Sequence, residues 1–515
     1  GMATPLSGMK QSNNALQVAV DNTPENPLDN PRIETIFEYM KRVHHWKIGV
    51  VTDAFLVDAT PAAAQAHNRS RGQYFNLAQQ MIGHFADGTA QPLAGYRSLA
   101  ALNQPLDVLM GGGAAHWMKE GNPELKTFYQ YAKGGRKDVD LVTDVAPQKG
   151  YTVVRNLEEL KSAPNGKKLL GIFSGEFRPG SSGLGPDNVP GTLDRLVARG
   201  AARIRGKGAS DPEIQLDLPP PQGTGCGATS GECFRRVPMK AEMVEKAIDV
   251  LDALAGRNSG WMLLVEQSQS DKLAHILEYE RSTYEVIELD QAVAAVSRRL
   301  AKDKRSLIVL TSDHAQPQTI IGVAMPGAST SGTCFSTTQG RYPITLGGTD
   351  GDRPCALQDA VATFNDASFP TYEDRNGDGF PDDPDPEIKL VIEDGGRPTY
   401  STTYRTNFMP LRPSMESGED GKVTALPALP NPARQPEGLL MTGNMPSRNV
   451  KGGANKTSGA VEIAPHTADD VLVSAQGAGA NHFAGIYENA DIATRLARAL
   501  GGRPSSGRAG TLGGF

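Results

Sequence analysis

The sequence predicts an α/β fold built on a doubly wound, mainly parallel sheet with helices on both faces. Short, unbroken apolar runs recur along the chain, as expected for parallel strands that are covered on both faces. Longer amphipathic stretches lie between these runs, and strands that alternate with helices are typical of such sheets. A chain of 515 residues is long enough for a large enzyme of this class with insertions.

The apolar runs give the order of the predicted strands, which are residues 48–51, 108–110, 169–173, 262–265, 307–310 and 471–473. A helix is predicted to begin at Asn30 and Pro31, because asparagine is a good N-cap and proline suits the first helical position. Two further helices are predicted over 238–255 and 276–300. Doubly wound sheets bind ligands beyond the C-terminal ends of their strands, so polar residues that follow the strands are candidates for a site.

Residues 320–455 interrupt this alternation. The segment is rich in Gly, Pro, Ser, Thr and Asn and is too long for a simple loop. We interpret it as an insertion that covers one end of the sheet, which leaves a core of residues 1–319 and 456–500. Residues 501–515 are rich in Gly, Ser and Arg and are predicted to form a flexible tail.

Charge and hydropathy exclude two classes of partner. The net charge of −6 comes without a basic block, so no nucleic-acid partner is predicted. No apolar run approaches the roughly 20 residues that a membrane-spanning helix needs, so no membrane span is predicted. Four cysteines form two close pairs in loop-like sequence, Cys226 with Cys233 and Cys334 with Cys355. The alternatives are two local disulfides in an oxidising compartment or four free thiols, and the even pairing without a Cys-x-x-Cys motif favours disulfides.

The segment 261–275 carries metal-binding side chains at the end of a predicted strand. Glu266 ends the apolar run, and Asp271 and His275 follow four residues apart. That spacing puts a carboxylate and an imidazole on the same face of a helix, as a pair of metal ligands requires. Lys272 stands directly after Asp271. The alternative interpretation is an ordinary solvated helix start.

Two other segments place similar groups beside predicted strands, and a third is described in the next paragraph. Asp313 and His314 follow the run 307–310, and His466 precedes the run 471–473. A carboxylate with an imidazole suits zinc, although an Asp-His pair can also cap a helix.

In the third segment, Asp58 and Thr60 are hard oxygen donors that suit magnesium. Thr60 can also N-cap a helix that has Pro61 at its first position. Arg71 follows, and a guanidinium there can hold a phosphate with two parallel hydrogen bonds.

Taken in chain order, these segments resemble the motifs of the alkaline phosphatase family. Asp58-Ala-Thr-Pro-Ala-Ala with a downstream Arg comes first, followed by Val265-Glu-x4-Asp-x3-His, Thr311-x-Asp-His and His466-Thr-x-Asp-Asp-Val. The segment Asp107-Val-Leu-Met-Gly-Gly-Gly also resembles a motif of the family. The resemblance spans residues 3–320 and 455–500, and motifs in register are much more specific than any one of them.

The resemblance implies an alkaline-phosphatase-like fold and a phosphomonoesterase that uses two zinc ions and one magnesium ion and forms a phosphoserine intermediate. Arg71 would clamp the phosphate, and Lys272 would touch it through water, as in a bacterial subgroup; alternatively Lys272 is a solvated surface charge. The family tends to dimerise, so the resemblance also implies a homodimer. The implied metal ligands are Asp271, His275 and His466 for the first zinc, Asp313 and His314 for the second, and Asp58, Thr60 and Glu266 for magnesium.

The nucleophile of the family has no counterpart in these 515 residues. Residues 7–16 resemble the stretch that follows the family's Asp-Ser-Ala-like motif, so counting back places the serine a few positions before Gly1. The strand whose aspartate bridges zinc and magnesium would lie further upstream, and Ser7 and Ser12 fall too late in the motif. Truncation is favoured over a natural non-catalytic relative, because losing a central strand exposes apolar neighbours and backbone groups. We therefore expect little or no phosphatase activity from this chain alone.

A second metal-binding motif lies in the insertion at 374–385. Oxygen-bearing side chains stand at positions 1, 3, 5, 9 and 12 with glycine at position 6, as in a calcium loop. The alternative is an acidic, Gly-rich turn. Calcium here would order the insertion and fits a periplasmic or extracellular protein. The predicted calcium ligands are Asp374, Asn376, Asp378, Asp382 and Asp385.

The leading prediction is thus an alkaline phosphatase that acts on small phosphomonoesters. A phosphodiesterase or sulfatase on the same fold is a second prediction, which would differ in the nucleophile. A calcium-ordered binding or structural protein on a phosphatase scaffold is a third, non-enzymatic one.

Overall fold

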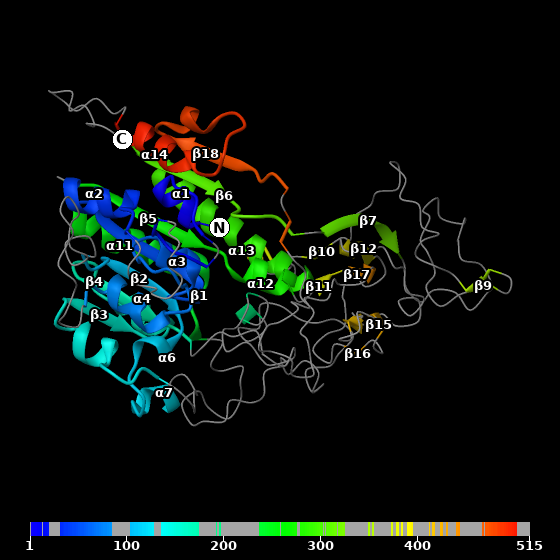
Figure 1. Cartoon of the computed structure of the whole chain (residues 1–515), viewed down its shortest axis with the longest axis horizontal. Helices are drawn as coiled ribbons and strands as arrows, with labels where there is room; N and C mark the ends of the chain where they lie inside the picture. Colours follow the sequence, from blue (N-terminus) through cyan, green and yellow to red (C-terminus); the bar gives the residue numbers. More distant parts are fainter. Residues whose placement is uncertain are drawn as a thin grey trace.

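The computed structural model describes most of the predicted core and a set of short strands in the insertion (Figure 1). The longer described stretches are residues 2–12, 14–19, 31–84, 104–127, 135–174, 236–257, 259–275, 279–301, 305–316 and 469–501. The remaining described residues are 192, 195–196, 303, 318–324, 377–380, 466–467 and the short strands between 349 and 442.

The core is a parallel five-stranded sheet with the strand order β3-β4-β2-β1-β5. This confirms the predicted α/β fold with a mainly parallel sheet. Four of the strands coincide with apolar runs in the sequence, whereas the short β3 lacks such a run. The strands are β1 (Lys47–Phe55), β2 (Val108–Gly112), β3 (Tyr151–Val154), β4 (Lys168–Ile172) and β5 (Trp261–Glu266).

Helices cover both faces of the sheet, and alternate residues of β1 point to each face. Val51 packs with α11 (Lys240–Ala255) in one apolar cluster. Ile48 and Val50 pack in a second cluster with α2 (Ile36–His44), α3 (Ala59–Ala63) and α4 (Tyr74–Met81). The other helices of the described core are α6 (Ala114–Trp117), α7 (Pro123–Thr127), α8 (Leu157–Ser162), α12 (Gln269–His275), α13 (Tyr279–Leu300) and a π-helix at Leu141–Val145.

The first long helix begins later than predicted. The Thr35 side chain accepts a hydrogen bond from the Glu38 amide, and the Glu38 carboxylate accepts one from the Thr35 amide. This reciprocal capping box starts α2 at Ile36 rather than at Asn30 and Pro31.

β6 (Leu307–Thr311) matches the predicted strand at 307–310, whereas β18 (Val473–Gly477) begins only at the last residue of the predicted run 471–473. The two form a separate antiparallel pair, whereas parallel strands of the main sheet were expected. The pair packs against a 3-10 turn at Ala480–Phe483 and α14 (Asp491–Gly501). Figure 1 shows α1 (Ala3–Ser7) next to α14 of this unit, and the two helices are in contact.

β5 has one free edge within the part of the chain that the structure describes. It pairs with β1 along its whole length and has no strand partner on its other side there. All of its residues from Trp261 to Glu266 are half-buried, whereas β1 is buried from Ile48 to Phe55. Among the described residues this edge of β5 therefore has no strand that pairs with its backbone N–H and C=O groups.

The insertion contains short strands, many of them antiparallel pairs, and one three-stranded sheet, β17-β12-β7. Because β7 begins at Gln318, the predicted boundary at 319/320 falls within a strand, and the domain limits remain predictions. The cysteines and residues 502–515 lie outside the described residues. The strands are β7 (Gln318–Ala324), β8 (Thr349–Asp350), β9 (Arg353–Pro354), β10 (Tyr372–Glu373), β11 (Asp383–Pro384), β12 (Lys389–Asp394), β13 (Leu411–Arg412), β14 (Met415–Ser417), β15 (Val423–Ala425), β16 (Leu429–Pro430) and β17 (Leu439–Thr442).

Among the described residues, no helix is both long enough and apolar enough to cross a membrane.

Gly111 provides a test of the packing between β2 and β1. A Cβ atom at Gly111 would lie 2.7 Å from Cγ2 of Thr52 and 3.2 Å from the carbonyl oxygen of Ala54. We expect Gly111→Ala to lower the free energy of unfolding by about 1–3 kcal/mol, because the buried strands have no room for the methyl group. Urea denaturation measures this change. Gly166→Ala is the control, since nothing lies within 4 Å of a Cβ there; equal stability of the two variants would contradict the predicted clash.

Candidate metal and phosphate site

The site begins where β1 and β5 end at the same edge of the sheet. Thr52 pairs with Glu266 in the parallel register, and the Thr52 hydroxyl donates to Oε2 of Glu266 over 2.5 Å. β1 continues into a loop whose Asp58 caps α3 by accepting a hydrogen bond from the Ala59 amide over 2.7 Å. Asp58, rather than Thr60, is therefore the N-cap of this helix. The pairing of two distant strands brings both carboxylates to one place.

Two cations hold the buried carboxylate of Asp58. Lys272 Nζ donates to Oδ2 over 2.6 Å, and Arg71 Nη2 donates to Oδ1. The Asp58 side chain is 5% exposed and that of Lys272 is 15% exposed, so Lys272 is not a solvated surface charge. Burial alone would raise the pKa of Asp58, but Lys272 and Arg71 hold it down at about 2. Arg71 is 43% exposed and keeps part of its guanidinium accessible to solvent.

Glu266 has the opposite electrostatic character. Burial and the negative charge of Asp58 raise the pKa of Glu266 to about 7, against the smaller lowering effect of the Thr52 hydrogen bond. Burial lowers the pKa of Lys272, but the charge and hydrogen bond of Asp58, with the charges of Glu266 and Asp271, together raise the net pKa. The buried carboxyl of Asp58 and the half-buried one of Glu266 thus influence each other electrostatically, and Lys272 interacts with both, an arrangement that a divalent cation would stabilise.

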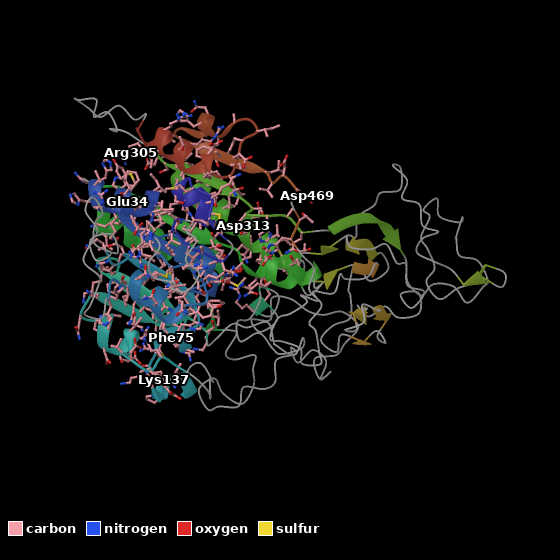
Figure 2. The ribbon with its side chains drawn as sticks, viewed as in Figure 1. Glu34, Phe75, Lys137, Arg305, Asp313 and Asp469 are labelled. Carbon is pink, nitrogen blue, oxygen red and sulfur yellow. The ribbon has the colours of Figure 1, made fainter. Side chains whose placement is uncertain are left out.

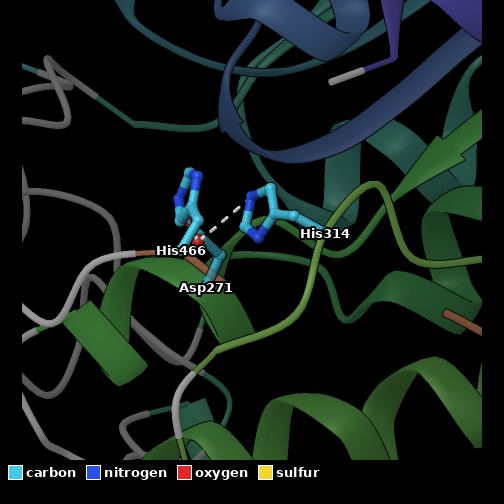
Figure 3. A group of neighbouring side chains, drawn as sticks. All are labelled: Asp271, His314 and His466. Atoms are coloured by element: carbon cyan, nitrogen blue, oxygen red, sulfur yellow. Dashed lines mark ion pairs between the residues drawn. The ribbon is translucent and has the colours of Figure 1, made fainter. Parts of the chain in front are cut away.

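A second group of candidate ligands comes from α12, from the segment after β6 and from the segment before β18 (Figure 3). One ligand atom from each of Asp271, His314 and His466 lies within 4.8 Å of the others. Nε2 of His466 is 3.2 Å from Oδ1 of Asp271, and Nε2 of His314 is 3.5 Å from the same oxygen. The two imidazole rings stack with their centroids 3.4 Å apart.

A short backbone bridge brings the two histidines together. Ala315 pairs with Thr467, and the Thr467 amide donates to the Ala315 carbonyl over 3.0 Å. The bridge is antiparallel, so His314 and His466 precede it from opposite directions, and it holds the two segments close enough for the imidazole rings to stack. The side chain of Asp313, after the end of β6, is 31% exposed, whereas that of Arg305, before the other end of β6, is 81% exposed and lies at the periphery (Figure 2).

The donor set of this cluster fits zinc. One carboxylate and two imidazoles are ligands that zinc takes in tetrahedral sites. His314 Nδ1 is buried and has no hydrogen-bond partner among the described residues, so the ring has a nitrogen available for coordination. Asp313 lies beside His314, with Oδ1 3.5 Å from Nε2.

The structure groups the predicted ligands differently from the predicted assignment, and some of them lie outside the described residues. The described cluster combines Asp271 and His466, predicted for the first zinc, with His314, predicted for the second. Thr60 lies half-buried in the first turn of α3, and the side chain of His275 lies outside the described residues. Of the calcium ligands only Asp378 is described. The individual metal assignments therefore stay predictions.

Two site residues were missed by the sequence reasoning. Gln316 donates through Nε2 to Oδ1 of Asp271 over 2.7 Å, and Thr52 holds Glu266. Gln316 stands two positions after His314 and therefore belongs to the same turn. Thr52 lies inside an apolar strand, where a hydroxyl gives no recognisable signal.

The fold and the two groups of side chains define an α/β protein with a candidate metal site at the edge of a parallel sheet. The sequence model of the alkaline phosphatase family matches residues 1–379. The chain therefore belongs to the alkaline phosphatase family. His466 lies beyond the matched residues, and the structure places it against Asp271.

Curated relatives include streptomycin-6-phosphate phosphatase from Streptomyces griseus, which is 29% identical over 57% of this chain and 56% of its own length. Alkaline phosphatase from Escherichia coli K12 is 29% identical over 61% of this chain and 57% of its own. The chain thus spans little more than half the length of these relatives. The alkaline phosphatase of the Antarctic bacterium TAB5 covers 97% of this chain and 82% of its own, with 15% identity and a TM-score of 0.46.

Lys272→Met tests the electrostatic link between α12 and Asp58. Without metal and near neutral pH we expect the free energy of unfolding to fall by about 1–3 kcal/mol, because a buried carboxylate loses a charged partner. In the unchanged protein the stability from Asp58 is present above its unfolded pKa of 3.8 and is lost as the pH falls through about 2. The variant raises the pKa of Asp58 and moves this loss to higher pH. Urea unfolding at a series of pH values measures both effects.

The control is the double variant Lys272→Met/Asp58→Asn, which leaves no unpaired carboxylate. We expect it to recover part of the lost stability. A single variant as stable as the unchanged protein at every pH would show that the ion pair contributes nothing.

Proposed function

We propose that the protein is a metal-dependent phosphomonoesterase. The convergence of Asp271, His314 and His466 beside the Asp58, Lys272 and Arg71 group carries this proposal. The first group offers zinc ligands and the second offers carboxylates for magnesium and cations for phosphate. Membership of the alkaline phosphatase family supports the same activity.

Each part of the site has a separate role in this proposal. Asp271, His275, His314 and His466, with Asp313, would hold two zinc ions, and Asp58, Thr60 and Glu266 would hold magnesium. Bound zinc supplies positive charge that activates a hydroxyl or water and stabilises a leaving oxygen. Arg71 and Lys272 already donate to the oxygens of Asp58. The same N–H groups suit phosphate oxygens, with Arg71 the more accessible of the two.

The nucleophile is expected outside this chain. The Ser7 hydroxyl donates to the Ala3 carbonyl of its own helix over 3.1 Å, which agrees with leaving it out of the reaction. The free, half-buried edge of β5 supports a further strand beside it, as the resemblance implies. We propose that such a strand completes the site.

We further propose that the loop at 374–385 binds calcium. β10 and β11 pair through Tyr372 with Pro384 and Glu373 with Asp383, so the ends of the loop are held together. Phe380 is 3% exposed and stacks on Tyr284 of α13, with ring centroids 6.5 Å apart. Gln291 of α13 donates to the Asp378 carbonyl over 2.7 Å. Calcium would stiffen a loop that already docks on the core.

The calcium loop and the predicted disulfides favour a periplasmic or extracellular setting, and we propose this location for the protein. We propose small phosphomonoesters as its substrates. The homodimer remains a prediction from the family resemblance.

The activity is tested with p-nitrophenyl phosphate in the presence of zinc and magnesium. We expect little or no turnover by the 515-residue chain, because its described site lacks a nucleophile. We also expect zinc binding by calorimetry, reduced in His314→Ala and in His466→Ala. A chain extended by its upstream coding sequence should turn the substrate over. Failure of the unchanged chain to bind zinc would contradict the proposed function, and full turnover without upstream residues would contradict the proposed nucleophile.

Calcium binding is tested with the variant Asp374→Ala/Asp378→Ala. We expect calorimetry to show calcium uptake by the unchanged chain and its loss in the variant, because both carboxylates are predicted ligands. Asp303→Ala, an exposed aspartate with no place in the loop, is the control. Equal calcium uptake by all of these proteins would rule out the loop as the site.

A further inference from the structure

A buried group of charges lies behind the metal site, and the family motifs do not include its central pair. Asp53 lies in β1 and Lys240 begins α11. Their side chains are 3% and 0% exposed, and Lys240 Nζ lies 3.2 Å from Oδ1 of Asp53. A fully buried lysine and aspartate are costly to desolvate unless they make further polar contacts, so their other partners indicate what the pair does.

Asp53 holds the start of the helix that carries Asp271 and Lys272. Its Oδ1 accepts a hydrogen bond from the Ser268 amide over 2.6 Å, and its Oδ2 accepts one from the Gln269 amide over 3.3 Å. The Gln269 side chain also donates to the Asp53 carbonyl over 3.0 Å. These contacts fix the first residues of α12 to the end of β1.

Lys240 holds the end of the neighbouring strand. Its Nζ donates to the backbone carbonyl of Glu266, the last residue of β5, in addition to its contact with Asp53. The side chain of Glu266 is held separately by Thr52. One ion pair therefore joins β1, β5 and α12 at the point where each delivers a predicted ligand.

Neighbouring side chains already occupy the surrounding carboxyl groups. Asp53, Glu285 and Glu288 lie close enough together to hold a cation. However, Lys240 contacts Asp53, and Arg195 Nη2 donates to Oε2 of Glu288 over 2.8 Å. The two oxygens of Glu285 accept hydrogen bonds from the Thr192 amide and from Gln267. Because each carboxyl group has protein partners, this arrangement favours a structural network over a further metal site.

We propose that Asp53 and Lys240 are positioning residues, which set α12 and the end of β5 so that Asp271, Lys272 and Glu266 can bind metal and phosphate. This rests on the proposed function, because positioning matters only if the site binds those ligands. Groups that orient metal ligands from behind commonly change metal affinity when they are replaced. Neither residue touches the substrate in this proposal.

The test uses Asp53→Asn, Lys240→Met and the double variant, which removes the pair without leaving a buried unpaired charge. We expect zinc affinity, measured by calorimetry, to fall about 10- to 100-fold in all three. We also expect the Ser268 and Gln269 amides to exchange hydrogen faster in Asp53→Asn and in the double variant. The double variant should be more stable to unfolding than either single variant, but its zinc affinity should stay as low as theirs.

A matched control exists at the opposite end of β1. Lys41 Nζ lies 2.5 Å from Oδ2 of Asp107, which also accepts from the Ile48 amide, and both side chains are largely buried. Lys41→Met/Asp107→Asn should leave zinc affinity and exchange at Ser268 unchanged. The positioning role is overturned if the Ser268 and Gln269 amides exchange hydrogen at an unchanged rate in Asp53→Asn. It is also overturned if the parent binds zinc and the double variant binds it with the same affinity. A parent that binds no zinc overturns the proposed function instead, and the exchange measurement still decides the positioning role.

Discussion

Because Thr52 lies opposite Glu266 in the parallel pairing of β1 and β5, two segments far apart in sequence leave the sheet at the same edge. Asp58 follows from one strand, and α12 with Asp271 and Lys272 follows from the other. A shift of this register by one residue would turn Glu266 to the opposite face of the sheet. The pairing of β1 with β5 is thus the constraint that brings the candidate ligands to one place, and the loops then set their positions more closely.

The charges at this edge follow from desolvation. A buried carboxylate must find a cation or take up a proton, and the structure shows both outcomes. Lys272 and Arg71 keep Asp58 ionised, and Arg195 with Lys240 keeps the pKa of Glu288 low despite its burial. Where no cation compensates fully, as at Glu266, the pKa rises instead. Metal ions at this edge would therefore neutralise the buried carboxylates in place of the lysine and arginine side chains, and more strongly.

The sequence allowed the strands of the core to be predicted because their apolar runs are continuous, but it carried less information about their partners. The direction of β6 and β18 was wrong, since an apolar run looks the same whether its neighbour is parallel or antiparallel. The ligand motifs were recognisable as motifs, yet the contact of His466 with His314 depends on a backbone bridge that no spacing reveals. Asp53 and Lys240 were missed because a single charge in an apolar segment says nothing about its partner.

The half-buried edge of β5 also has a consequence for the behaviour of this chain in concentrated solution. Natural edge strands discourage self-association with charged residues, proline or bulges. Residues 261–265 are Trp-Met-Leu-Leu-Val, which contain none of these devices, and the edge extends over the whole strand. Such a segment is a template for pairing with another copy, so the protection of this edge bears on the colloidal stability of the protein as well as on its site.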